Sequence, residues 1–156
     1  MDRTRRVALK GAGMSSLLVA GFATGLLRPR DAWAADWNKN AFESKTVSDA
    51  LNSLGVQKVV PSADIVIKAP DIAENGAVVP IDITSNIPGT ERISVLVDKN
   101  PFPYVGTFDV SKGALPYVHL RVKMGESSNV RVVVTANGQH YEAVKEVKVT
   151  IGGCGG

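Results

Sequence analysis

Residues 130–151, VRVVVTANGQHYEAVKEVKVTI, decide the fold. Two stretches rich in β-branched residues are joined here by Asn137-Gly138, and both residues of this pair tolerate the positive φ that a two-residue hairpin turn requires. The pattern therefore predicts a β-hairpin with strands at Val130–Ala136 and Tyr141–Ile151.

The apolar alternation of the second predicted strand is interrupted near its middle. The apolar residues of one face are Tyr141, Ala143, Val147, Val149 and Ile151. Val144 is apolar but falls on the opposite face, and Lys145 is charged but falls on the apolar face. This break in the alternation predicts a β-bulge at these two residues.

Five further stretches with strand periodicity precede the hairpin. They are Ile65–Ala69, Val78–Ser85, Arg92–Asp98, Tyr104–Val110 and Tyr117–Lys123. Turn residues separate them, at Glu74-Asn75-Gly76, Pro88-Gly89, Asn100-Pro101, Lys112-Gly113 and Gly125. About seven short strands at this spacing predict an all-β, immunoglobulin-like β-sandwich, with a β-barrel as the alternative. A parallel α/β sheet is excluded because no segment after Pro61 has the periodicity of a crossover helix.

One short helix is predicted before the strands, between Asn38 and Gly55. The apolar residues that share a helical face are Phe42, Val47, Ala50, Leu51 and Leu54. Thr46, followed three residues later by Asp49, resembles a capping box, and Gly55 is a natural helix stop.

The charge of the chain is concentrated at its N-terminus. The 156 residues are enough for one domain with a hydrophobic core, and their formal net charge is +3. Residues 1–34 carry six basic and two acidic side chains, and removing these from totals of 18 and 15 leaves 12 and 13, a charge of −1 for residues 35–156. No basic patch with interleaved aromatic residues remains, so we do not expect a nucleic-acid partner.

The N-terminal residues have the pattern of an export signal. Arg5 and Arg6 are followed by an apolar position and a lysine in the spacing of a twin-arginine signal. The uncharged stretch 11–27 contains four glycines and is shorter and less apolar than the roughly 20 residues of a membrane-spanning helix. Ala32-Trp33-Ala34 offers the small residues that a signal peptidase recognises. We therefore expect cleavage before Ala35 and a periplasmic protein, with a permanent N-terminal anchor as the alternative.

The twin-arginine route exports proteins that are already folded, usually with a cofactor or a partner bound in the cytoplasm. We therefore ask what this chain acquires before it is exported. Residues 35–156 contain no CxxC, no haem-attachment motif and no glycine-rich phosphate loop. The two histidines, His119 and His140, fall in predicted strands, where solvent-facing side chains are expected, and no third metal ligand accompanies them. The sequence thus predicts no cofactor and no metal, and we attribute the signal to export of a pre-assembled protein complex.

The chemistry of the chain is predicted at its only cysteine, Cys154. The residues around this cysteine are Gly152, Gly153, Gly155 and Gly156. Glycines remove neighbouring side chains and any strong conformational preference, so we expect a flexible arm that can enter a narrow cleft. Three extended residues after Ile151 would place the sulfur roughly 10 Å beyond the sheet.

The thiol of Cys154 is expected to be free and reactive without being activated. A disulfide within the chain is impossible, and no lysine, arginine or histidine lies beside it in the sequence. Prenylation needs three residues after the cysteine, and a bacterial lipid anchor needs the cysteine at the start of the mature chain. A C-terminal thiocarboxylate, suggested by Gly155-Gly156, belongs to small cytosolic carriers and conflicts with the export signal.

Signal, strands and tail together resemble the SoxY family, the covalent carrier subunits of the Sox thiosulfate-oxidation system. Residues 152–156 match the Gly-Gly-Cys-Gly-Gly ending of that family. Segments 70–80 (PDIAENGAVVP), 85–90 (SNIPGT) and 122–125 (VKMG) also look like family segments. The resemblance covers nearly all of the mature chain.

This resemblance implies a heterodimer with SoxZ, a sandwich subunit that has no signal of its own. It also implies a reaction cycle on Cys154. A SoxAX-type cytochrome joins thiosulfate oxidatively to the thiol, a SoxB-type hydrolase releases sulfate and leaves a persulfide, and a SoxCD-type sulfane dehydrogenase oxidises the remaining sulfur in some organisms. The chain would then be a carrier on which enzymes act and not an enzyme, with the adduct on Cys154 in place of a cofactor.

These expectations divide the chain into four segments. Residues 1–34 form the signal peptide, 35–60 a helical segment, 61–151 the carrier sandwich and 152–156 the arm. One alternative from another class remains open, an exported scaffold or adhesion module in which Cys154 forms an interchain disulfide.

Overall fold

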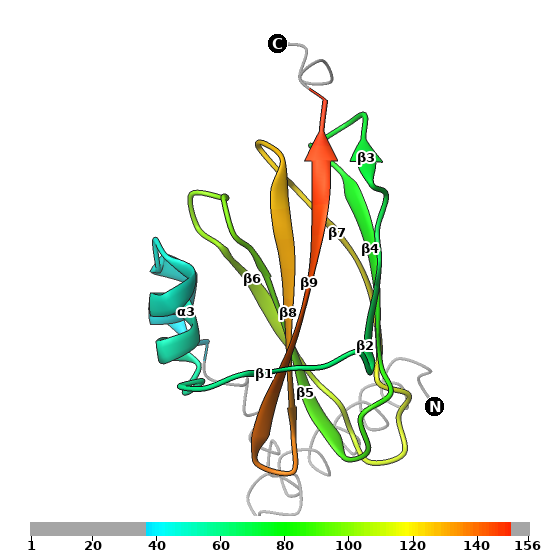
Figure 1. The fold of residues 1–156 in the computed structure, drawn as a ribbon. Helices are drawn as coiled ribbons and strands as arrows, with labels where there is room; N and C mark the ends of the chain where they lie inside the picture. Colours follow the sequence, from blue (N-terminus) through cyan, green and yellow to red (C-terminus); the bar gives the residue numbers. More distant parts are fainter. Residues whose placement is uncertain (1–36, 151–156) are drawn as a thin grey trace, which may run out of the picture. The chain divides into compact units, whose positions relative to one another are not determined.

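The computed structural model describes residues 37–150, which belong, from Asn38 onward, to one compact unit. The expected signal peptide and the expected arm lie outside these residues. Two helices, α2 (Lys39–Glu43) and α3 (Val47–Ser53), come first and strands follow (Figure 1). The strands are β1 (Val60–Pro61), β2 (Ile65–Lys68), β3 (Ile72–Ala73), β4 (Val79–Ser85), β5 (Thr90–Val97), β6 (Tyr104–Asp109), β7 (Tyr117–Val122), β8 (Ser128–Ala136) and β9 (Gln139–Val149).

The strands form two sheets. The larger sheet has the order β1-β9-β8-β5-β6, with β3 also paired to β9, and the smaller sheet has the order β2-β4-β7. Each of the seven predicted strands corresponds to one of the strands β2 and β4–β9, which confirms the immunoglobulin-like β-sandwich. Two separate sheets also rule out the alternative of a single closed barrel.

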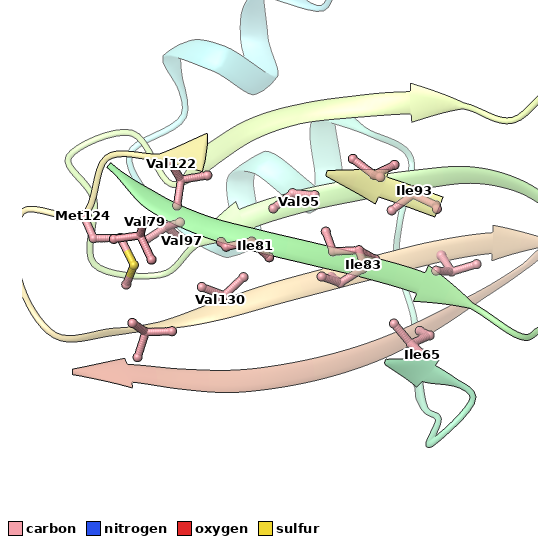
Figure 2. Packing of buried hydrophobic residues seen from close by; sticks show 14 of the residues in the cluster. Ile65, Val79, Ile81, Ile83, Ile93, Val95, Val97, Val122, Met124 and Val130 are labelled. Atoms are coloured by element: carbon pink, nitrogen blue, oxygen red, sulfur yellow. The ribbon is translucent and has the colours of Figure 1, made fainter. Parts of the chain in front are cut away.

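The main core lies between the two sheets. Alternate residues of β4, β5 and β8 point into it, because successive side chains of a strand face opposite sides (Figure 2). The fully buried members from these strands are Val79, Ile81, Ile83, Ile93, Val95, Val97, Val130, Val132 and Val134. Burying each such side chain contributes roughly 1.5–3 kcal/mol, so the period-two pattern of the sequence is the main determinant of this fold.

The helical segment packs on the outer face of the larger sheet. Ala41 and Ala50 are buried there against Leu96 and Val133, which are the residues of β5 and β8 that face away from the main core. The ring of Phe42 meets that of Tyr104 edge-on, with 4.6 Å between their centres.

The prediction of one continuous helix is wrong, because two helices with separate caps occupy this segment. Ser44 has extended backbone angles (φ −61°, ψ 135°) and interrupts the helix. The Thr46 hydroxyl accepts a hydrogen bond from the Asp49 N–H (3.1 Å) and so starts α3. The predicted capping residues are thus confirmed, but they begin a second helix. Gly55, with φ +76°, follows the end of α3 as predicted.

The β8–β9 hairpin has the predicted turn but not the predicted bulge. Asn137 and Gly138 both have positive φ (51° and 73°). The two strands pair without a shift of register from Ser128–Val147 to Ala136–Gln139. No bulge is needed because β9 lies near the sheet edge, where Lys145 forms an ion pair with Asp71 (2.7 Å). The register shifts are found in β5, beside β6 and beside β8.

Candidate functional site

All residues that the sequence assigned to function lie outside the described part of the chain. These are Arg5, Arg6, Gly152, Gly153, Cys154, Gly155 and Gly156. The structure does describe the base of the expected arm, because Thr150 is only four positions before Cys154. An extended chain spans at most about 3.6 Å per residue, so four residues span at most about 14 Å.

Strand β9 continues past the end of its partner β8. The pairing of the two strands ends at Ser128 and Val147, and the neighbouring chain then turns away. The backbone N–H of Val149 instead donates a hydrogen bond to the hydroxyl oxygen of Ser127 (2.9 Å). The same hydroxyl donates to the carbonyl oxygen of Val149 (3.5 Å). One side chain therefore replaces the missing strand on this side.

The other side of β9 is held by β3. The Lys148 N–H donates to the Asp71 carbonyl oxygen (2.9 Å), and the Thr150 N–H donates to the Ala73 carbonyl oxygen (3.1 Å). These bonds belong to a short parallel pairing in which Ile72 and Ala73 lie opposite Lys148 and Val149. Strand β3 lies beside the end of β9, just before the chain leaves the described part (Figure 1).

Gly76 completes the base of the arm from the loop after β3. Its carbonyl oxygen accepts a hydrogen bond from the Met124 N–H (2.7 Å), which ties this loop to the β7–β8 connection. A Cβ atom at position 76 would overlap the Met124 carbonyl oxygen and lie 2.7 Å from Val149 Cγ1. Only glycine allows these three segments to come so close.

A Gly76→Ala substitution is expected to destabilise the protein by about 1–3 kcal/mol, because backbone and Val149 must move apart to admit the methyl group. The melting temperature should fall by several degrees. Gly125→Ala is the matched control, since a Cβ there meets nothing within 4 Å and surface changes usually stay within about 0.5 kcal/mol. Equal midpoints of thermal unfolding for the two variants would contradict the close contact at Gly76.

An exposed ion pair lies beside these backbone contacts. The Lys145 ammonium donates a hydrogen bond to Asp71, and this bond, together with the attraction between the two charges, lowers the pKa of the Asp71 carboxyl group. The pair therefore persists at neutral pH and is lost only in acid, as the pH falls through the lowered pKa. It links the residue before β3 to the middle of β9.

The two histidines lie on strands away from the base of the arm. On β7, Nδ1 of His119 is 2.9 Å from Asp82 Oδ1, which also accepts a hydrogen bond from the Tyr117 hydroxyl. These two hydrogen bonds, that from Tyr117 first, lower the pKa of Asp82. On β9, His140 contacts Thr135 (3.0 Å).

No group of three His, Cys, Asp or Glu side chains suited to hold a metal is found within residues 37–150. In the same range, neither helix has the length and apolar character needed to cross a membrane.

The residues that build the base of the arm were not foreseen from the sequence as functional. Gly76 was assigned to a turn, and its Asn75-Gly76 pair gives no sign of the contact with Val149. Ser127 carries no local signal, because its role depends on the register at which β8 stops pairing. Strand β3 has only two residues, too few for any periodicity to mark it.

A family model and a solved structure point to the same family of proteins. A family model described as sulfur oxidation protein SoxY matches residues 51–154, a range that ends at Cys154. The solved structure of the sulfur carrier protein SoxY from Chlorobium limicola f thiosulfatophilum is 44% identical, covers 68% of this chain and 97% of its own, and has a TM-score of 0.62.

The remaining comparisons add nothing to this result. An engineered protein of known structure is 16% identical, covers 57% of this chain and 21% of its own, and has a TM-score of 0.40, too low to support an argument. No curated protein matches the chain significantly. The family model spans well over half of the sequence, and the Chlorobium protein is a close relative over a similar share. This chain belongs to the SoxY family of sulfur-oxidation proteins.

Proposed function

We propose that this protein is a periplasmic carrier that binds thiosulfate-derived sulfur covalently on Cys154 and presents it to partner enzymes. The observation that carries the proposal is the family match, which extends as far as Cys154. The structure supports it because the last contacts of the sandwich hold Thr150, four positions before the cysteine. A thiol at this position has a tether of defined maximum length.

The proposed loading step joins the Cys154 sulfur to the outer sulfur of thiosulfate. The thiol loses its proton, a sulfur–sulfur bond forms, and two electrons leave one at a time through the haem of a SoxAX-type cytochrome, which passes them to a further electron acceptor. A SoxB-type hydrolase then adds water to the terminal sulfonate, which is released as sulfate. A persulfide remains on Cys154. The carrier contributes the nucleophilic sulfur and the tether, and the partner enzymes contribute the catalysis.

We further propose that the chain works as a heterodimer with a SoxZ-type subunit. This partner would explain why a chain whose sequence predicts no cofactor carries a signal for folded export. A SoxCD-type sulfane dehydrogenase is the proposed oxidant of the persulfide where that enzyme is present.

A Gly153→Val, Gly155→Val double variant is expected to react more slowly with the partner enzymes but normally with a small thiol reagent. Valine keeps the thiol and the length of the arm but adds two β-branched side chains beside the sulfur. The variant should react with a small thiol reagent at the parental rate. Its kcat/KM with the loading cytochrome and with the hydrolase should fall at least tenfold, roughly the cost of one steric contact in a fitted channel.

The control for this variant is the small reagent itself, measured on the same preparation. Parental rates in both enzyme reactions would contradict the proposal that partner enzymes enclose the arm. A slower reaction with the small reagent would contradict it as well, since the loss would then lie in the thiol.

A further inference from the structure

We propose that Ser127 and Gly76 are positioning residues that fix the end of the described strand at Thr150, and so the point from which the proposed arm starts. The consequence for sulfur transfer rests on the proposed function of Cys154. The fixed point itself rests only on contacts among described residues. It determines how far from the sandwich the cysteine can react.

The fixed point lies beyond the place where the pairing with β8 alone would put it. Pairing between β8 and β9 ends at Val147, which is seven positions before Cys154, whereas Thr150 is four positions before it. At about 3.6 Å per residue, the two starting points give maximum reaches of about 25 Å and about 14 Å. The contacts of residues 148–150 therefore shorten the free segment before Cys154 from seven positions to four, and they reduce the radius that it can span around its last fixed residue by almost half.

The contacts of residues 148–150 alternate between the two sides of β9. Lys148 and Thr150 donate their N–H groups toward β3, and Val149 donates its N–H group toward Ser127. Neighbouring residues of a strand direct their backbone groups to opposite sides, so neither set of bonds alone completes the strand. Since no residue of β8 is paired with Val149, the Ser127 hydroxyl satisfies both of its backbone groups.

Packing reinforces these hydrogen bonds. Val149 packs against the main core, and its Cγ1 atom lies where a side chain on Gly76 would have to be. Met124, whose N–H binds the Gly76 carbonyl oxygen, is almost completely buried. The Gly76 loop, which is tied to Met124, and the Ser127 hydroxyl thus meet on a single residue of β9, Val149, and hold it.

Amide hydrogen exchange of the full chain tests the fixed point without reference to sulfur chemistry. In Ser127→Ala, the N–H groups of both Val149 and Thr150 should exchange roughly fivefold faster, the effect of one lost hydrogen bond on a cooperative local opening. Ser127→Thr keeps the hydroxyl and should restore parental exchange. Ser62→Ala is the control, because that hydroxyl also accepts one backbone N–H bond, from Asp64 (3.2 Å).

Thr150 is the decisive amide in this experiment, because its own acceptor, the Ala73 carbonyl oxygen, is untouched by the substitution. Faster exchange at Val149 alone would mean that β3 holds the end of the strand by itself. That result would overturn the role of Ser127, as would faster exchange at Thr150 in Ser62→Ala.

A shortened arm tests the consequence for reach. Deleting Gly152 and Gly153 leaves the cysteine two positions after Thr150, a reach of about 7 Å, and should nearly abolish loading by the cytochrome. Adding Ser127→Ala to this deletion should make loading about fivefold faster, in proportion to the larger population of the released strand.

Equal loading of the two shortened variants would overturn the role of the fixed point in transfer. A parent chain that accepts no sulfur at all would overturn the proposed function instead, and the exchange result would still decide whether Ser127 holds the strand.

Discussion

A Cys154→Ser variant is expected to accept no sulfur from thiosulfate in the presence of the loading cytochrome. Serine keeps the size of the side chain, but its hydroxyl cannot form the sulfur–sulfur bond that the proposed step requires. Since Cys154 is the only cysteine, no other side chain of this protein can replace it. Loading should therefore fall to the background of a reaction without carrier, as measured by transfer of labelled thiosulfate sulfur to protein.

The same variant should fold like the parent. Cys154 follows the last described contacts by four positions, and the main core of the described part is built from side chains of the sandwich. Substitutions away from a core usually change the free energy of unfolding by less than about 0.5 kcal/mol. Residual loading of Cys154→Ser, or a melting temperature lower by several degrees, would contradict the proposal that the cysteine serves only as the carrier.

Replacing Arg5 and Arg6 with lysine is expected to retain the whole protein in the cytoplasm. Lysine keeps the positive charge but lacks the planar guanidinium group, so the pair no longer has the twin-arginine pattern. The proposed partner subunit, which would depend on this chain for export, should be retained with it. Fractionation followed by immunodetection of both subunits measures the effect.

Replacing Arg28 and Arg30 with lysine is the matched control, since this change preserves the charge of the segment and leaves Arg5-Arg6 intact. Export of the control with retention of the Arg5, Arg6 variant would support the twin-arginine route. Normal export of the Arg5, Arg6 variant would contradict that route, and export of the partner without this chain would contradict joint export.

The fold could be predicted from the sequence wherever burial alternates with a period of two. Strands β4, β5 and β8 each place every second residue in the main core, and the Asn137-Gly138 pair marks the hairpin between β8 and β9. One detail failed in β9, where the apolar alternation of the sequence is broken. The pattern at Val144 and Lys145 predicts a bulge, whereas Lys145 reaches Asp71 at the edge of the sandwich without one.

The helical segment shows a second limit of the sequence pattern. Its apolar residues recur at helical spacing on both sides of Ser44, because both helices bury one face against the same sheet. Periodicity alone does not distinguish one long helix from two short helices that pack on a common surface. The cap at Thr46 was the sign of a second helix, and it was correctly identified as a cap.

The candidate site likewise has one part that the sequence predicts and one part that it does not. Its reactive residue was evident from composition, because the chain has a single cysteine and four glycines flank it. The base of the arm was not evident, because Ser127, Gly76 and Ala73 come together only through the register of three chain segments. Contacts of this kind, between residues far apart in the sequence, leave no periodicity and no motif in it.

Intact-mass spectrometry of the natively exported protein tests the carrier function most directly. The account predicts a population of molecules whose mass exceeds that of the mature chain by sulfur atoms or by a thiosulfonate group. Fragmentation should place the whole increment on Cys154, and reductant should remove it. A chain with an unmodified thiol during growth on thiosulfate, or one found only as a disulfide-linked pair of chains, would contradict the carrier and favour a scaffold.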